Sequence, residues 1–330
     1  MVRRAHLIAN SKSGHGKGAL LAEQAPHICK ELGYELIIYD IENSYDFETQ
    51  CQKAIDAAGK DEGIVIAAGG DGTIRGVAQA AHNTSVRFGA IPCGTFNFFA
   101  RTHLIPEDPL EAFRLALLGS VTKVRLGSIN GNVFLINASL GLYAQAIRDR
   151  EKRTSRFGRN RIVVIVSTFI SLLSDHLLLK VDLLIDGAIK SVRTPMIFIG
   201  NNSLQLRDLA LEVARCMKID SLAVVMMKPI TKLETLRIIF RGLFKTLDNE
   251  EKLETFCVDE LTIYTRKPSH EIALDGEILR MSSPLRVKAL PGALNLVKHP
   301  ALEPKLRASF VLLIFRIPIL GRFYQAYKKA

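Results

Sequence analysis

The chain has 330 residues, enough for two domains that each bury a core of their own. A hydrophobic content of 48% and a mean hydropathy of +0.16 exclude a largely disordered protein. The 44 Lys and Arg residues outnumber the 33 Asp and Glu residues by 11, which favours an anionic partner without choosing among a nucleotide, a phospholipid surface and a nucleic acid.

The cysteines and the apolar runs indicate in which cellular compartment the protein is expected. The chain has an odd number of cysteines: Cys29, Cys51, Cys93, Cys216 and Cys257. They form no CxxC pair, and their spacing is not that of a metal site. We therefore expect no zinc site, no disulfide framework and a reducing compartment. The basic N-terminus lacks the apolar core of a signal peptide. The apolar run at 162–173 has 12 residues, fewer than the roughly 20 of a membrane span, so we expect a buried helix there.

The first part of the chain alternates strands and helices. Apolar periodicity predicts strands at 4–10, 34–39, 63–68 and 86–91, and helices at 19–32, 47–58, 74–81 and 107–118. This alternation predicts a parallel, layered α/β sheet.

Three glycine-rich turns follow predicted strand ends, at 10–18, 69–73 and 92–95. Ligands of such sheets gather at the carboxyl ends of the strands, so a shared site is expected at that edge. The first turn, with Gly14, Gly16, Gly18, Lys12 and Lys17, can wrap an anion or be a solvated basic turn. Its spacing matches neither a Walker A loop nor the dinucleotide fingerprint GxGxxG.

The second turn, Gly69-Gly70-Asp71-Gly72-Thr73, is the most informative stretch of the sequence. Its glycines permit a close approach of an anion, and the following helix points its positive end there. Asp71 would repel phosphates unless a divalent cation bridges the two, so we predict a nucleotide and Mg²⁺. We also expect Asp71 to face solvent. The alternative is an ordinary strand-to-helix turn in which Asp71 or Thr73 caps the helix.

The pattern changes to shorter β-type runs near 119–127, where we place a domain boundary. Strands are predicted at 133–138, 179–185, 192–199, 210–213, 221–226, 256–265, 271–274 and 285–290, and helices at 143–149 and 232–244. The expected fold class is α/β plus mainly-β. An N-terminal layered α/β nucleotide-binding domain (1–125) precedes a C-terminal antiparallel β-sandwich-like domain (126–300) for the lipid substrate and a basic apolar tail (301–330).

Two basic segments are candidates for membrane contact. The segment 148–161 is either a solvated face or a contact with anionic lipid headgroups. The tail at 305–330, interrupted by Pro318, is either an interfacial anchor or a helix packed on the second domain. Nucleic-acid binding is disfavoured because the first segment lacks interleaved aromatic residues. A cytoplasmic protein that associates peripherally with the membrane is expected, and a homodimer stays open.

An ordered set of motifs resembles a known family. Asn10-x-x-Ser13-Gly14, the turn at 69–73, Gly94-Thr95-Phe96-Asn97-Phe98-Phe99-Ala100-Arg101 and Asp275-Gly276-Glu277 follow one another as in the diacylglycerol kinase catalytic domain family. That family includes sphingosine kinases and bacterial lipid kinases, and the resemblance covers about residues 4 to 290. NAD kinases and phosphofructokinases carry a similar glycine turn, but the motif at 94–101 is closer to the lipid kinases.

The resemblance implies an ATP-dependent, Mg²⁺-requiring kinase that phosphorylates a hydroxyl of a lipid such as diacylglycerol or a sphingoid base. Asp71 would organise the metal and act in catalysis, and Asp275 or Glu277 would accept the proton. Without the resemblance, Asp275-Gly276 reads as a two-residue hairpin turn. The nucleotide would contact Asn10, Lys12, Ser13, Gly69, Gly70, Gly72, Thr73, Gly94, Thr95 and Asn97.

Two positions depart from the family pattern. Phe98 stands where these lipid kinases usually carry an Asp after the Asn, and Arg125 stands where a further Asp usually opens the interdomain strand. Two carboxylates are lost and a cation is gained, although Arg125 can compensate by holding a phosphate. The stretch 204–209 also lacks the family's glycines, and only Lys218-Ile219-Asp220-Ser221 loosely resembles its Asp-Asp-Gly turn, which argues against a structural Mg²⁺ there. The alternatives are a catalytically impaired nucleotide- or lipid-binding member and, with less support, an NAD kinase.

Overall fold

A computed structural model describes residues 3–9, 17–41, 46–141, 144, 147, 178–202, 216, 220–229 and 253–299. Several predicted features lie outside these residues: the first glycine turn up to residue 16, the basic segment 148–161, the buried helix at 162–173, the strand at 210–213, the helix at 232–244 and the tail at 305–330. The predicted helix at 143–149 is described only at Ala144 and Ile147, which are both helical.

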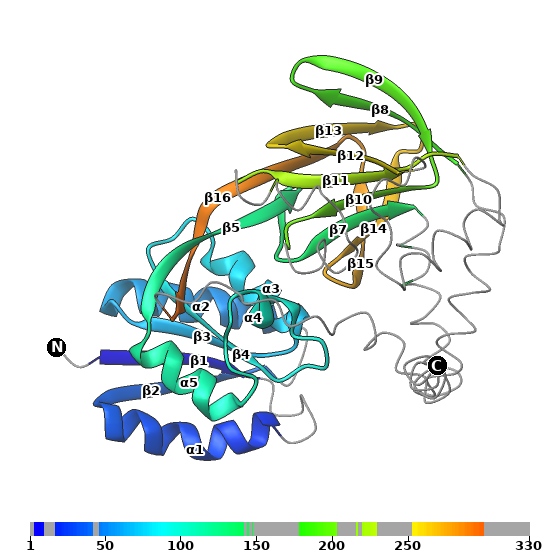
Figure 1. The fold of residues 1–330 in the computed structure, drawn as a ribbon. Coiled ribbons are helices and arrows are strands. Elements are labelled where there is room, and N and C mark those ends of the chain that lie inside the picture. Colours follow the sequence, from blue (N-terminus) through cyan, green and yellow to red (C-terminus); the bar gives the residue numbers. More distant parts are fainter. Residues whose placement is uncertain are drawn as a thin grey trace, which may run out of the picture.

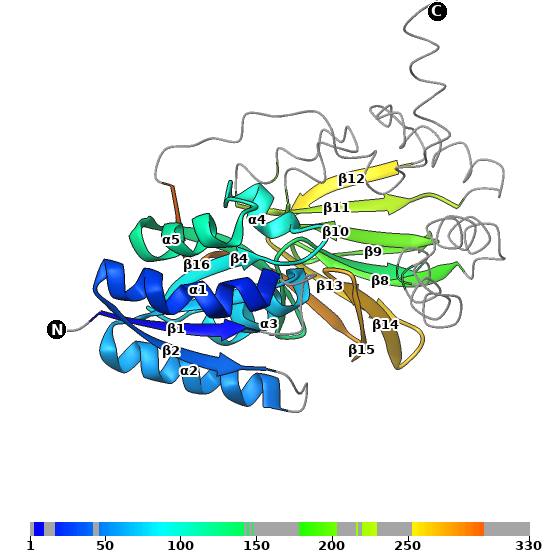
Figure 2. The ribbon, with the colours of Figure 1, turned by 90° about the horizontal axis from the view of Figure 1, so that it is seen from below.

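The N-terminal part is the predicted alternating α/β arrangement, with one short helix more (Figure 1). Its elements are β1 (Arg3–Ala9), α1 (Lys17–Leu32), β2 (Tyr34–Asp40), α2 (Phe47–Asp61), β3 (Ile64–Gly69), α3 (Asp71–Ala81), β4 (Arg87–Pro92), α4 (Phe98–Thr102) and α5 (Pro109–Leu118). The strands pair in parallel in the order β2-β1-β3-β4. Helices α1 and α5 cover one face and α2 and α3 the other (Figure 2).

Burial explains why these residues form a covered sheet. Every residue of β3 is buried, as expected for a parallel strand with helices on both faces. Helix α5 begins with Pro109 after Asp108, whose carboxylate accepts the N–H groups of Leu110 and Glu111 at 3.0 and 2.9 Å.

The remaining strands form the rest of this sheet and a second one. They are β5 (Ser120–Ile129), β6 (Asn132–Phe134), β7 (Asn137–Gly141), β8 (Leu179–Ile185), β9 (Ala188–Thr194), β10 (Met196–Gly200), β11 (Leu222–Met227), β12 (Leu253–Val258), β13 (Glu260–Thr265), β14 (Ser269–Leu274), β15 (Glu277–Ser282) and β16 (Leu285–Lys298). The second sheet is antiparallel, in the order β12-β11-β10-β7-β14-β15.

The long strand β16 carries the first sheet from the N-terminal strands into the later ones. Asn295 and Leu296 pair in parallel with β4, whereas residues 285–288 pair antiparallel with β13, which continues to β8 and β9. Strand β5 pairs antiparallel along β16, with a shift of register between Leu290 and Leu294. The division at residues 125 and 300 stays a prediction.

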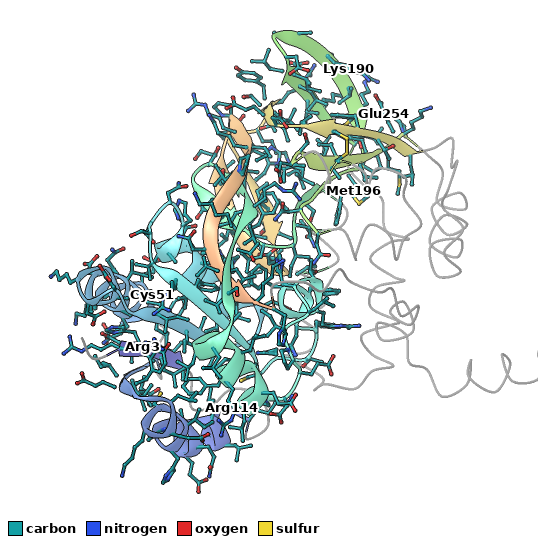
Figure 3. The ribbon with its side chains drawn as sticks, turned by 60° about the vertical axis from the view of Figure 1, so that its left-hand side comes forward. Arg3, Cys51, Arg114, Lys190, Met196 and Glu254 are labelled. Carbon is teal, nitrogen blue, oxygen red and sulfur yellow. A yellow bond between two sulfur atoms is a disulfide. The ribbon has the colours of Figure 1, made fainter. Side chains whose placement is uncertain are left out.

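Three runs that the sequence predicted as single strands are each two strands in different sheets. The run 133–138 is β6 and β7, the run 192–199 is β9 and β10 around Pro195, and the run 256–265 is β12 and β13 around Asp259. We call the point where the chain passes from one sheet to the other a crossing. Both strands of each pair contribute to the same buried apolar cluster, so the hydrophobic pattern continues through the crossing and does not reveal it. The edges of the two sheets also meet, where Lys190 of β9 pairs with Glu254 of β12 (Figure 3).

The expectation that no disulfide forms is wrong. Cys216 is bonded to Cys257, which lies on β12. The two cysteines are 41 residues apart, so no local spacing announced the pair. Cys216 comes close because its carbonyl accepts the N–H of Ser221, just before β11, and β11 pairs with β12. Among the described residues, no helix is both long and apolar enough to cross a membrane.

Candidate functional site

The second glycine turn lies where β3 meets α3. Gly69 ends the strand, Gly70 is the residue before the helix, and α3 begins at Asp71, three residues earlier than predicted. Gly72 and Thr73 therefore belong to the first turn of the helix. A Cβ atom at Gly69 would stand 2.5 Å from the Cβ of Thr73, so the strand and the helix approach closely only because this residue is glycine.

The third glycine turn packs directly against the second. A Cβ atom at Gly94 would lie 2.8 Å from the Cα of Gly70, and the N–H of Cys93 donates to the carbonyl of Gly69 at 2.9 Å. Asn97 has a left-handed backbone with a φ of 51°, and its side chain bonds the N–H and the carbonyl of Gly94, both at 3.0 Å. Thr95, between Gly94 and Asn97, is exposed.

The first glycine turn is described only at its end. β1 ends at Ala9, which is in register with Ala68 of β3, so this turn leaves the same edge of the sheet as the second one. Lys17 begins α1. Burial raises the pKa of the Cys93 thiol, and the charge of Lys17 acts in the opposite direction. Lys17 therefore lies near the third turn. The positions of Asn10, Lys12 and Ser13 stay outside the described residues.

Asp71 joins the second turn to the third. Its carboxylate accepts the N–H of Phe98 at 3.2 Å and that of Phe99 at 3.2 Å, so it occupies the N-terminal end of α4. Burial raises the pKa of Asp71 in spite of these hydrogen bonds. Asp71 is only partly exposed, and the carboxylate that was expected to face solvent is instead hydrogen-bonded to the backbone of α4.

Asp275 holds one of the crossings between the sheets. The turn Asp275-Gly276 is the two-residue hairpin between β14 and β15, with φ values of 49° and 93°. The Asp275 carboxylate accepts the N–H groups of Leu135, Ile136 and Asn137 at 2.7, 2.8 and 2.9 Å. These amides lie where the chain passes from β6 to β7. Burial nevertheless raises the pKa of Asp275 to about 6.

Glu277 brings the hairpin to the start of α3. A Cβ atom at Gly72 would stand 2.1 Å from Glu277 Oε1, so this carboxylate lies over the first turn of the helix. Arg75 Nη2 donates to Glu277 Oε2 at 2.5 Å. Sequence reasoning missed Arg75. Its signal was the spacing, because residues three apart on a helix share a face and Arg75 is three residues after Gly72.

The two departures from the family pattern have different surroundings. The ring of Phe98 stacks on that of Phe96, with centroids 5.7 Å apart. The guanidinium of Arg125 donates from Nε to Asn201 Oδ1 at 2.7 Å and lies 3.7 Å from a carboxylate oxygen of Asp220. Its side chain is 9% exposed, and burial lowers its pKa. Arg125 thus ties β5 to the segments that follow β10 and precede β11.

The described residues suit phosphate groups better than a protein-held metal. The second and third turns present glycine backbone, a helix N-terminus and nearby cations, which are the features that bind phosphates. Among these residues no group of three His, Cys, Asp or Glu side chains is placed to hold a metal ion. A divalent cation would have to take most of its ligands from the nucleotide, as Mg²⁺ commonly does.

Comparisons with known proteins agree with this arrangement. Residues 4–129 match the family model of the diacylglycerol kinase catalytic domain. A diacylglycerol kinase from Staphylococcus epidermidis is 31% identical over 147 residues, which cover 44% of this chain and 46% of that protein. An uncharacterised Synechocystis protein is 27% identical over 309 residues, covering 88% of this chain and 69% of that protein.

The fold comparison extends over nearly the whole chain. A crystal structure of a diacylglycerol kinase from Bacillus anthracis superposes with a TM-score of 0.68 and 21% identity, covering 90% of this chain and 98% of that one. That likeness shows the fold. The two contacting glycine turns both lie within residues 4–129, so this part of the chain is similar to the diacylglycerol kinase catalytic domain.

Proposed function

We propose that the protein is an ATP-dependent lipid kinase, which transfers the γ-phosphoryl group to a hydroxyl of a lipid such as diacylglycerol or a sphingoid base. One observation carries the proposal. The second glycine turn, the third glycine turn and Glu277 come together at the start of α3, although they are far apart in the sequence. Such a site combines an anion cradle with a carboxylate, which phosphoryl transfer to an alcohol requires.

The chemistry can be assigned to these residues. The lipid hydroxyl oxygen forms a bond to the γ-phosphorus while the bond from that phosphorus to the β–γ bridging oxygen breaks, and ADP leaves. The hydroxyl proton passes to a carboxylate. We assign this role to Glu277, because its Oε1 lies over the helix terminus that would face the phosphates. The oxygens of Asp275 already accept three backbone N–H groups, so Asp275 holds the turn in place.

Bound Mg²⁺ would neutralise charge on the phosphates, and Asp71 is the residue predicted to organise it. The Asp71 carboxylate accepts the N–H groups of Phe98 and Phe99 and could also accept a hydrogen bond from a metal-bound water. The third turn, with Thr95 and Asn97, would contact the phosphates from the other side.

The lipid acceptor implies a membrane surface. We propose that the basic segment 148–161 and the tail 305–330 supply the contact, because clustered Lys and Arg residues attract anionic headgroups. Both segments lie outside the described residues. Deleting residues 305–330 should reduce binding to anionic vesicles, and unchanged binding would remove the tail from this role.

The test is phosphate transfer from labelled ATP to a panel of lipids in mixed vesicles, read by mass detection. Wild type and Arg114→Met should transfer equally, because Arg114, labelled in Figure 3, pairs with Glu31 in the last turn of α1, whereas the third glycine turn lies near Lys17 at the start of that helix. Glu277→Gln should transfer at least about 100-fold more slowly. A folded, Mg²⁺-replete wild type that labels no lipid contradicts the proposal, and labelling of NAD instead would indicate an NAD kinase.

A second candidate is a member of the family that binds nucleotide or lipid without catalysis. It is favoured by the engagement of Asp71 with α4, by Phe98 in place of a carboxylate, and by the lack of a metal-binding group among the described residues. ATP binding that is unaffected by Mg²⁺ and is followed by no turnover would support it. Binding that tightens with Mg²⁺ supports the kinase.

A further inference from the structure

One face of α3 is polar and docks onto later parts of the chain. Gly72, Arg75 and Gln79 follow one another at helical spacing. Gln79 accepts the N–H of Val133 at 2.7 Å and donates to the carbonyl of Gly131 at 3.2 Å. Arg75, one turn earlier, donates to Glu277. The helix that begins at the phosphate cradle is therefore joined to the hairpin that carries the candidate proton acceptor.

Arg75 is an unusual residue to bury at this junction. Its side chain is only 12% exposed, whereas that of Glu277 is 50% exposed, and Arg75 Nε is buried without a hydrogen-bond partner in the described part of the chain. A guanidinium loses favourable hydration on burial and needs carboxylates in return. Arg75 has two carboxylates near it, Glu277 and Asp275. Its charge acts on Asp275 by lowering the pKa that burial raises.

We propose that Arg75 is a positioning residue, which fixes the Asp275–Glu277 hairpin against the first turn of α3 and so sets the place of the proton acceptor. This inference rests on the proposed kinase function. Arg75 needs no contact with ATP or lipid for this role. The ion pair fixes the rotamer that carries Glu277 Oε1 over Gly72.

The test uses the full chain with Arg75→Met, Arg75→Lys and the control Arg114→Met. Arg75→Met should lower kcat by about 100-fold, with the KM for ATP changed by less than about threefold, because positioning and not nucleotide binding is lost. Arg75→Lys should keep part of the rate, since a lysine retains the charge but not the planar donor geometry. Millimolar guanidinium should restore part of the rate of Arg75→Met and leave Arg114→Met unchanged. A merely structural role would not produce this rescue.

Hydrogen exchange supplies a readout that needs no activity. Arg75→Met should speed exchange of the amides of Leu135, Ile136 and Asn137, which donate to Asp275, and Arg114→Met should not. Unchanged exchange, or faster exchange with an unchanged kcat, overturns the positioning role. If wild type transfers no phosphate, the kinase proposal fails, and exchange alone decides whether Arg75 holds the hairpin.

Discussion

Replacing Gly72 by alanine should separate activity from stability. The new Cβ would stand 2.1 Å from Glu277 Oε1, so the carboxylate has to leave the start of α3. The obstacle is the far end of a flexible, half-exposed side chain, which can rotate toward solvent. The helix itself gains, because alanine favours a helix over glycine by about 0.5–1 kcal/mol.

The two stability effects nearly cancel. Losing a partly exposed ion pair costs about 0.2–1 kcal/mol, so the free energy of unfolding should change by less than about 1 kcal/mol and the melting temperature by no more than about 2–4 °C. The rate should fall much further. Displacing a general base costs about 10²-fold or more in kcat. Thermal unfolding and steady-state transfer assays on the same preparation measure both quantities.

Gly76→Ala on the same helix is the matched control. Its Cβ would stand 2.1 Å from Phe47 Cε1, and this ring packs against the buried apolar core formed by β1, β3, β4 and their covering helices. Overpacking of this kind costs about 1–3 kcal/mol, while Glu277 is untouched, so kcat per folded molecule should stay at the wild-type value. The reasoning is refuted if Gly72→Ala keeps the wild-type kcat, or if it loses as much stability as Gly76→Ala.

Three further predictions concern other parts of the molecule. Arg125→Met should lower the free energy of unfolding by about 1–3 kcal/mol in urea titrations, because it leaves buried acceptors unpaired; an unchanged midpoint would contradict the network with Asp220. The pKa of Asp275 in the folded protein is about 6, above its ordinary value. The contribution of this residue to the free energy of unfolding should therefore decrease as pH rises from about 4 to 6. Transfer should instead rise through the same window, since the ionised form holds the hairpin; a rate independent of pH there opposes this. Reducing the disulfide between Cys216 and Cys257 should lower the free energy of unfolding by up to about 4 kcal/mol, because it closes a loop of 41 residues. A thermal melt with and without dithiothreitol measures the resulting drop in melting temperature.

The N-terminal elements were predictable because their signals are local. Alternating buried runs such as β3, and caps such as Asp108 before α5, specify strands and helices within a few residues. The start of α3 was missed by three residues, since Gly70 and Gly72 suggested a loop. Gly72 is helical and lacks a side chain because Glu277 occupies the space, which is a tertiary reason that the local pattern does not carry.

The later strands were harder to predict, for a related reason. A strand pattern reports burial of alternate side chains and not the sheet to which the strand belongs. The crossings at Pro195 and Asp259 lie inside apolar runs, so each run reads as one strand. The sequence did single out Asp275, but as a hairpin or a proton acceptor. Its bonds to three amides at a crossing depend on contacts between residues about 140 apart.

The carboxylates of the site have different proposed roles: Asp71 organises Mg²⁺ and Glu277 accepts the proton. Asp71 therefore needs a different experiment from Glu277. Asp71→Ala removes the acceptor for the first N–H groups of α4, which costs about 0.5–2 kcal/mol, so a loss of activity would not separate chemistry from folding. Asn caps a helix about as well as Asp. Asp71→Asn should keep the melting temperature within a few degrees and remove the negative charge. If Asp71 organises Mg²⁺, this variant needs more Mg²⁺ for half-maximal transfer, whereas unchanged Mg²⁺ dependence would leave Asp71 with only the hydrogen bonds to Phe98 and Phe99.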